Sequence, residues 1–66
     1  MPLVHIEMFP RKDQKIKESL AEDITNAVVK NVGCEKKSVT IVFNEIPKEN
    51  WVVGGNFLSD LYKDID

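Results

Sequence analysis

A single long amphipathic segment between two short apolar segments constrains the fold of this chain more than any other feature. From Gln14 to about Val32 the apolar residues recur at steps of four, four, three, one and four, which is typical of one stripe along a helix: Ile16, Leu20, Ile24, Ala27, Val28 and Val32. Asp13 is a suitable N-cap, and Gly33 lies where a left-handed C-cap residue belongs. Lys17 and the other charged residues are expected on the remaining faces.

The segments on either side of this helix have the character of β-strands. Residues 2–9 alternate imperfectly, with Val4, Ile6 and Met8 on one face and a mixed set of side chains on the other. Val39–Phe43 is rich in β-branched residues and almost continuously apolar, which is typical of a strand covered on both faces. Strand, helix and strand form a β-α-β unit, whose strands are expected to be parallel with a right-handed crossover.

The C-terminal third is predicted to contain a small hairpin. Residues 50–57 carry Gly54 and Gly55 between short apolar stretches, a pattern that indicates a tight turn. Leu58–Asp66 is predicted to be weakly helical or frayed. We therefore expect an α+β fold: one domain over residues 1–66 with a single β-α-β unit, parallel strands and a C-terminal hairpin.

The size of the chain indicates that several copies fold together. A chain of 66 residues buries a limited fraction of its surface. Cys34 is the single cysteine, so no disulfide can form within the chain, and no Cys and His residues have metal-site spacing. A two-stranded sheet under one helix also leaves one face and both edges uncovered. The sequence therefore predicts an obligate homo-oligomer.

Charge and hydropathy exclude several kinds of partner. The net charge is −2 with acidic and basic residues interspersed, so there is no basic stripe for nucleic acid. No apolar run is long enough to cross a bilayer, and the N-terminus lacks the organisation of a signal peptide. One free cysteine fits a reducing compartment, so a cytoplasmic location is expected. His5 has no ligand-forming residue at metal spacing, and we interpret it as satisfied or solvent-facing.

Pro2 is the residue with the most distinctive chemistry. If Met1 is the initiator and is removed, the ring nitrogen of Pro2 becomes a free secondary amine. α-Amino groups titrate at about 7.7–8.0, and apolar surroundings lower that value, which suits a general base at neutral pH. If Met1 stays attached, the nitrogen is a tertiary amide and cannot accept a proton. The alternative interpretation is that this proline merely starts a strand.

The order of these features resembles a known family. A proline directly after the initiator, a strand, a long helix, a second strand ending in Glu45, and Trp51 followed by Gly54 and Gly55 occur here without gaps. In this combination, residues 2–58 resemble the 4-oxalocrotonate tautomerase family. The resemblance implies a dimer with a completed four-stranded sheet, or a hexamer built as a trimer of dimers. It also implies a cofactor-independent isomerase, without metal or organic cofactor, that interconverts enol and keto forms of a small unsaturated 2-hydroxy or 2-oxo acid.

The same resemblance assigns candidate site residues beside the general base and acid at position 2. The family arginine that holds a substrate carboxylate aligns with Lys12, and Arg11 lies one residue earlier, so either is a candidate. Trp51 matches the family's active-site aromatic, while Phe9 and Val53 match the apolar lining that excludes water from the proline nitrogen. The alternative interpretations are solvated loop cations and ordinary packing.

One departure from the family pattern bears on the substrate. Thr40 stands where members acting on dicarboxylates place a second arginine, and a hydroxyl cannot pair with a second carboxylate. A monocarboxylate or a different acceptor is therefore expected. Two alternatives remain: a superfamily hydratase, dehalogenase or decarboxylase that uses protonated Pro2, and a non-catalytic oligomer with a decayed site. Glu45 is interpreted as structural, with pairing across a subunit interface as one option.

Overall fold

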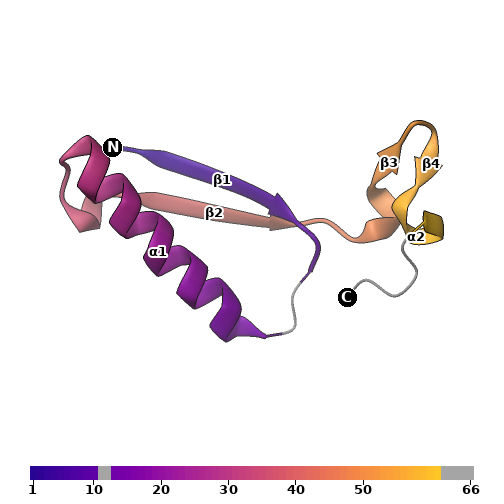
Figure 1. Cartoon of the computed structure of the whole chain (residues 1–66), viewed down its shortest axis with the longest axis horizontal. Coiled ribbons are helices and arrows are strands. Elements are labelled where there is room, and N and C mark those ends of the chain that lie inside the picture. The colour runs from indigo at the N-terminus through magenta and orange to yellow at the C-terminus, as the bar shows by residue number, and fades with distance from the viewer. Residues whose placement is uncertain (11–12, 62–66) are drawn as a thin grey trace.

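The computed structural model describes residues 1–10 and 13–61 and has one helix packed on a two-stranded sheet, with a small hairpin beyond it (Figure 1). In chain order the elements are β1 (Leu3–Met8), α1 (Gln14–Val32), the 3₁₀ turn η1 (Lys36–Ser38), β2 (Thr40–Glu45), the 3₁₀ turn η2 (Lys48–Asn50), β3 (Val52–Val53), β4 (Asn56–Phe57) and α2 (Leu58–Leu61). This order confirms the predicted α+β fold.

Strands β1 and β2 pair in parallel, as expected for two strands joined by a helix. The register runs from Leu3 opposite Thr40 to Met8 opposite Glu45. One more bond extends the ladder at each end: the Thr40 amide donates to the Pro2 carbonyl (3.0 Å), and the amide of Ile46 donates to the Met8 carbonyl (2.8 Å). The two strands are therefore held in register along their whole length.

The sheet has one covered and one open face within a single chain. Val4, Ile6 and Met8 are half-buried, whereas Leu3 and the other odd-numbered residues of β1 are exposed. Strand β2 follows the same alternation, and its Val42 is 41% exposed. The prediction of a second strand covered on both faces is wrong for the isolated chain, because one helix can cover only one face of the sheet.

Both predicted caps of α1 are confirmed. The Asp13 side chain accepts a hydrogen bond from the Lys15 amide at 2.9 Å, which satisfies one of the unpaired donors of the first turn. At the other end Gly33 has φ 81°, and its amide donates to the Val29 carbonyl at 2.9 Å. The helix therefore begins and ends where its sequence signals are.

The face of α1 that contacts the sheet differs from the predicted stripe. Ile16 and Val32 are 40% and 65% exposed, so these residues lie at the margin of the contact. Lys17 faces the sheet instead, contrary to the expectation that it occupies another face. The physical reason is that its aliphatic stem packs against the strands while its ammonium group finds a carboxylate there. The half-buried helix positions are Lys17, Leu20, Ala21, Ile24, Thr25, Val28 and Val29.

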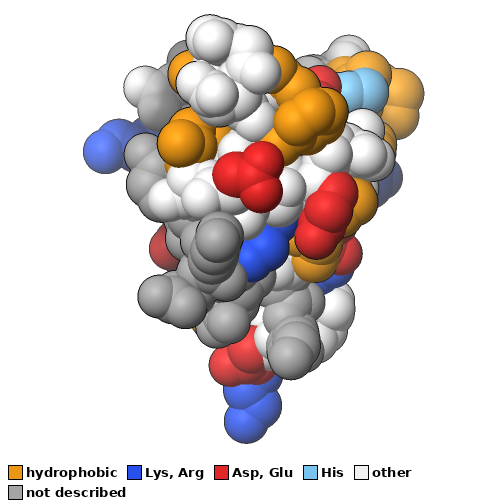
Figure 2. All heavy atoms as spheres, turned by 90° about the vertical axis from the view of Figure 1, so that its right-hand side faces the viewer, with side chains coloured by type: hydrophobic (Ala, Val, Ile, Leu, Met, Phe, Trp, Pro, Cys, Tyr) orange, Lys and Arg blue, Asp and Glu red, His pale blue; other side chains and the backbone are white. Residues whose placement is uncertain are grey.

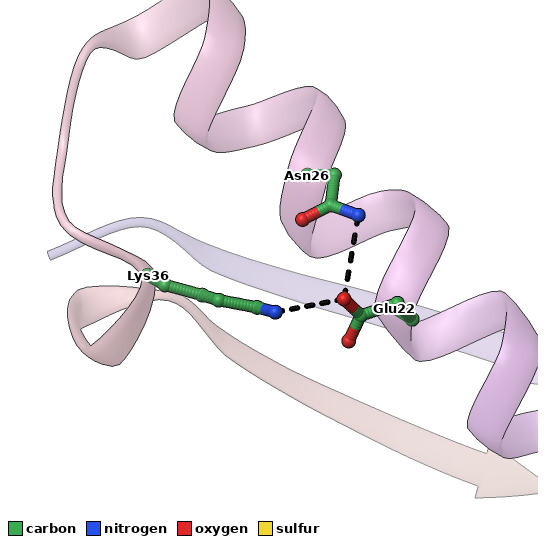
Figure 3. Close-up of polar contacts among 3 residues, drawn as sticks. All are labelled: Glu22, Asn26 and Lys36. Atoms are coloured by element: carbon green, nitrogen blue, oxygen red, sulfur yellow. Dashed lines mark hydrogen bonds and ion pairs between the residues drawn. The ribbon is translucent and has the colours of Figure 1, made fainter.

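A polar contact joins the middle of α1 to the 3₁₀ turn η1 that follows the helix (Figure 3). The Lys36 ammonium lies 2.7 Å from Glu22 Oε1, and the Asn26 amide donates to the same oxygen at 3.4 Å. The hydrogen bond from Lys36, reinforced by its charge, lowers the pKa of the Glu22 carboxyl. Both side chains of the ion pair are more than half exposed, so the contact orients η1 with little effect on the core.

The chain alone is not compact. Its radius of gyration is 15.0 Å, whereas a compact chain of this length has about 11 Å. Among the residues that the structure describes, Leu58 is the one buried hydrophobic side chain. Side chains that are merely half-buried contribute only part of their transfer free energy. A single copy therefore lacks the core that a stable domain needs.

Candidate active site

Pro2 lies at the head of the sheet, just before the first residue of β1. Its ring is half-buried, and its carbonyl is fixed by the hydrogen bond from the Thr40 amide. Met1, which precedes it, is 96% exposed. The structure thus brings the predicted acid and base residue together with Thr40, the position where the chain departs from the family pattern.

The predicted aromatic residues lie together at the opposite end of the sheet. The rings of Phe9 and Trp51 meet edge to face, with centroids 5.2 Å apart and planes at 67°. The Trp51 indole donates from Nε1 to the Ile46 carbonyl at 2.9 Å, and its backbone carbonyl accepts from Leu58 at 2.9 Å. Trp51 is therefore fixed by its ring, its indole nitrogen and its backbone.

The full length of β1 separates the two halves of the predicted site (Figure 1). Seven residue steps from Pro2 to Phe9 span about 23 Å in an extended strand. At that distance the aromatic pair cannot exclude water from the proline of the same chain. One copy therefore carries both halves of the predicted site without bringing them together.

Of the remaining candidate residues, Val53 lies within the described part of the chain. Arg11 and Lys12 lie outside the described residues. Val53 belongs to β3, which pairs antiparallel with β4, and is 58% exposed. Gly54 and Gly55 turn this hairpin with φ 61° and 86°, a conformation that other residues rarely adopt. The predicted hairpin is therefore confirmed, and Val53 is available for contact with another copy.

The hairpin end of the molecule exposes several apolar side chains. Figure 2 shows hydrophobic side chains at the surface of this end, with acidic and basic groups beside them. Val52, Phe57 and Leu61 are 52%, 46% and 51% exposed. Exposed apolar residues grouped in this way are characteristic of an interaction surface. This end therefore has the composition expected of a surface that contacts another chain.

An ion pair that the sequence did not predict joins α1 to the last residue of β2, at the same end of the sheet as the aromatic pair. Lys17 Nζ lies 2.9 Å from Glu45 Oε1, and the side chains of Lys17 and Glu45 are 17% and 29% exposed. The same nitrogen lies 5.8 Å from the centre of the Phe43 ring. Glu45 is thus structural, as predicted, but this bond is within its own chain. Sequence reasoning missed the pair because its partners are 28 positions apart and no local pattern joins them.

Other features of the described residues do not form an alternative site. A shallow groove of about 370 Å³ on α1 contains none of the predicted site residues; it is lined by Lys15, Ile16, Ser19, Leu20 and Asp23. Residues 1–10 and 13–61 contain no group of three or more His, Cys, Asp or Glu side chains suited to a metal ion. Within the same residues, no helix has the length and hydropathy needed to span a bilayer.

Comparison with known proteins agrees with the geometry. Residues 2–61 match the family described as "Tautomerase enzyme". A probable tautomerase of Lactiplantibacillus plantarum is 35% identical over 60 residues, which cover 91% of this chain and 94% of that protein. The 2-hydroxymuconate tautomerase of Comamonas testosteroni is 33% identical over 55 residues, which cover 83% and 87%.

Solved structures of the same family share the fold. TomN, a 4-oxalocrotonate tautomerase homologue of the tomaymycin biosynthetic pathway, superposes with a TM-score of 0.87 at 24% identity over 96% of this chain and 97% of its own. A chain of the heterohexameric 4-oxalocrotonate tautomerase of Chloroflexus aurantiacus gives 0.84 at 26% identity over 92% and 98%. The chain therefore belongs to the 4-oxalocrotonate tautomerase family and is an isomerase of the tautomerase class.

Proposed function

We propose that this protein is a cofactor-independent keto–enol tautomerase of the cytoplasm that acts on a small unsaturated 2-hydroxy or 2-oxo acid. Its acid and base group is the Pro2 nitrogen, freed by loss of Met1. The observation that carries the proposal is the position of Pro2, half-buried at the head of β1 and fixed by Thr40. Met1 is almost fully exposed, so its bond to Pro2 is accessible to an aminopeptidase.

The reaction needs one group that first accepts and then returns a proton. The free nitrogen takes the proton of the enol hydroxyl as the carbonyl forms, and the resulting ammonium gives a proton to the carbon at the far end of the conjugated system. No atom is gained or lost, and the proline returns to its starting state. A base of this kind contributes typically about 10²- to 10⁴-fold to the rate.

The site that we propose is shared between copies of the chain. Since β1 holds Pro2 and the Phe9–Trp51 pair at opposite ends, the aromatic wall beside each proline must come from another subunit. In this proposal Arg11 or Lys12 holds the substrate carboxylate, and Val53 adds apolar lining. The heterohexameric relative from Chloroflexus aurantiacus supports an assembly of several chains, and we propose a homo-oligomer here.

Thr40 restricts the substrate in this proposal. It is exposed and adjacent to the proline, and it offers one neutral hydroxyl. The hydroxyl carries no charge and cannot form an ion pair with a second carboxylate. We therefore propose a monocarboxylate in place of the dicarboxylate named for the Comamonas testosteroni relative.

Two measurements test the proposal. Intact-mass analysis of the purified protein should show the loss of one methionine. Ketonisation of phenylenolpyruvate, an enol monocarboxylate, should then fall by about 100-fold or more in Pro2→Ala. The variant should retain the oligomeric state of the wild type, since Pro2 contributes its carbonyl to the sheet and alanine keeps that carbonyl. Full turnover in Pro2→Ala, or a retained Met1 in an active enzyme, would contradict the proposal.

A further inference from the structure

The half-buried ion pair at the hairpin end of the sheet takes no part in the proposed proton transfer. Lys17 Nζ and Glu45 Oε1 are 2.9 Å apart, and both side chains are mostly shielded from solvent. Shielding two charges costs free energy that their attraction offsets only in part, so an apolar pair of similar volume often stabilises a fold equally well. The geometry that the pair imposes therefore explains it better than the stability that it adds.

We propose that Lys17 is a positioning residue for Trp51, the aromatic residue of the proposed site. It acts through Glu45 and the backbone of Ile46, and so fixes the direction of the indole ring in the substrate pocket. The role is indirect and requires no contact between the Lys17 ammonium group and the substrate. It rests on the proposed function, because it concerns the same pocket.

A series of contacts leads from Lys17 to the indole ring. Glu45 is the last residue of β2 and pairs with Met8 in the parallel ladder. The amide of the next residue, Ile46, donates to the Met8 carbonyl at 2.8 Å. The Ile46 carbonyl accepts the hydrogen bond from Trp51 Nε1 at 2.9 Å. A displacement of Glu45 therefore moves the acceptor that holds the indole nitrogen.

The end of β2 needs a restraint of this kind because the parallel ladder stops there. The Ile46 amide makes the final bond of the ladder, and the next residue, Pro47, has no amide hydrogen. The ends of strands open more readily than their centres. Helix α1 begins at Gln14, three residues before Lys17, close to this end of the sheet (Figure 1). The ion pair thus fastens the strand end to a rigid element.

The neighbouring Phe9 ring does not fix the direction of the indole by itself. Aromatic pairs are favourable over a range of tilts and over centroid distances of about 4.5–7 Å. The hydrogen bond from Trp51 Nε1 is directional and weakens steeply when it is bent. The direction of the ring therefore depends on the position of the Ile46 carbonyl, and through it on Glu45 and Lys17.

The same ion pair relates the two kinds of substrate contact in the proposed site. Arg11 and Lys12, the candidates for holding the carboxylate, directly precede the Asp13 cap of α1 in the sequence. Lys17 joins the first turns of that helix to the strand end that holds the indole acceptor. It thereby fixes the start of α1 relative to the aromatic lining.

The near-ultraviolet circular dichroism of Trp51 tests this role without reference to turnover. The chain has one tryptophan, so the indole bands report this ring alone. Lys17→Met keeps the aliphatic stem but removes the ammonium group. In folded, associated protein it should reduce the indole band by about half or more, because such bands require a fixed ring. Lys17→Arg can still donate to Glu45 and should keep the wild-type band.

Two control variants separate positioning from a general loss of stability. Gly33→Ala weakens the opposite end of the same helix, and Lys36→Met breaks the exposed ion pair with Glu22. Both should keep the wild-type indole band. If Lys17→Met does not associate, Glu45→Gln replaces it, since glutamine keeps an acceptor oxygen while it removes the charge, and a smaller loss of the band is expected. A wild-type band in the variant tested would overturn the inference, and so would an equal loss in Gly33→Ala.

Turnover of phenylenolpyruvate connects the direction of the ring with the proposed site. In Lys17→Met, kcat/KM should fall by about 10- to 100-fold and should recover in Lys17→Arg, since a misplacement of about 1 Å can cost about 100-fold. Full turnover in Pro2→Ala would contradict the proposed function, while the indole band would still report the contact of Lys17. An indole band lost in Lys17→Met with unchanged kcat/KM would instead remove the role of Lys17, even if Pro2 proves to be the catalytic base.

Discussion

The two ends of the sheet differ in how firmly they are built. At the head of the sheet, Pro2 is fixed by one backbone hydrogen bond, and the nearby contacts of Gly33 and Lys36 lie on the surface. At the hairpin end, Trp51 is fixed by its ring, its indole nitrogen and its backbone, beside a partly buried ion pair. The difference indicates that the aromatic end is prearranged within one chain, whereas the proline end has few contacts of its own.

Mixing two inactive variants gives the largest effect and tests whether the two ends work in different chains. Pro2→Ala removes the base and Trp51→Ala removes the wall, so each variant alone should have little activity in the phenylenolpyruvate assay. In a dimer that contains one of each, one of the two sites has both an intact proline and an intact tryptophan. Random reassembly from equal amounts should therefore recover about a quarter of wild-type activity.

The control for this mixing experiment is wild type mixed with the double variant Pro2→Ala/Trp51→Ala. In those mixed dimers each site lacks one group, so activity should fall below the share of wild-type chains. If the two single variants recover nothing after reassembly, while size measurements show mixed dimers, the proline and the tryptophan do not meet across subunits.

Breaking the Lys17–Glu45 ion pair should destabilise the hairpin end of the sheet. Lys17→Met keeps the aliphatic stem but leaves Glu45 without its Lys17 partner, and the two side chains are mostly shielded from solvent. We expect a loss of about 1–2 kcal/mol in the free energy of unfolding, less than the 3–5 typical of fully buried pairs. Urea unfolding at a fixed protein concentration measures it. Lys30→Met, on an exposed part of the same helix, should change stability little, and equal losses in both variants would argue against the pair.

Substitution of Gly33 probes the other end through backbone conformation alone. Gly33 has φ 81°, and no atom lies within 4 Å of the position that a Cβ would take, so Gly33→Ala meets no clash and loses only what the left-handed conformation costs. That cost is about 1 kcal/mol. Gly33→Asn should lose less, because asparagine tolerates this conformation better. Thermal unfolding of both variants gives the comparison, and a larger loss in Asn than in Ala would contradict it.

The smallest expected effect concerns Glu22 and its dependence on pH. The hydrogen bond and charge of Lys36 lower the pKa of Glu22 from its ordinary value of 4.5, so the folded state binds its proton less readily than the unfolded chain. The stabilisation is present above about pH 4.5 and is lost as the pH falls through the lowered pKa. Glu22→Gln should therefore have a slightly lower Tm than wild type at pH 7, and the gap should close in acid and shrink in salt. A gap that widens in acid would contradict this assignment.

Much of the fold followed from local signals in the sequence. Asp13 and Gly33 predicted both ends of the helix, and Gly54 and Gly55 predicted the hairpin turn, because capping and positive φ depend on few neighbours. The exact face of the helix did not follow. An apolar stripe cannot reveal that a lysine will face the sheet when its carboxylate partner lies on a distant strand.

The site could be predicted residue by residue but not in its arrangement. Phe9 and Trp51 were assigned one role and do meet in the structure. Their separation from Pro2 depends on the direction of β1, and the sequence alone does not show which residues of other copies complete each site. The position of Pro2 at the start of a strand and of Phe9 just beyond its end was nevertheless a usable signal that the two lie far apart within one chain.

The near absence of buried side chains has a consequence for the life of the protein in the cell. Because Leu58 is the one buried hydrophobic side chain among the described residues of a single copy, most of the free energy of folding must come from association, so stability rises with subunit concentration. A newly made chain would then stay unstable until it associates with another copy. Slow synthesis would lengthen this period and so increase the chain's exposure to proteolysis. The abundance of the enzyme would therefore respond to expression more steeply than in direct proportion.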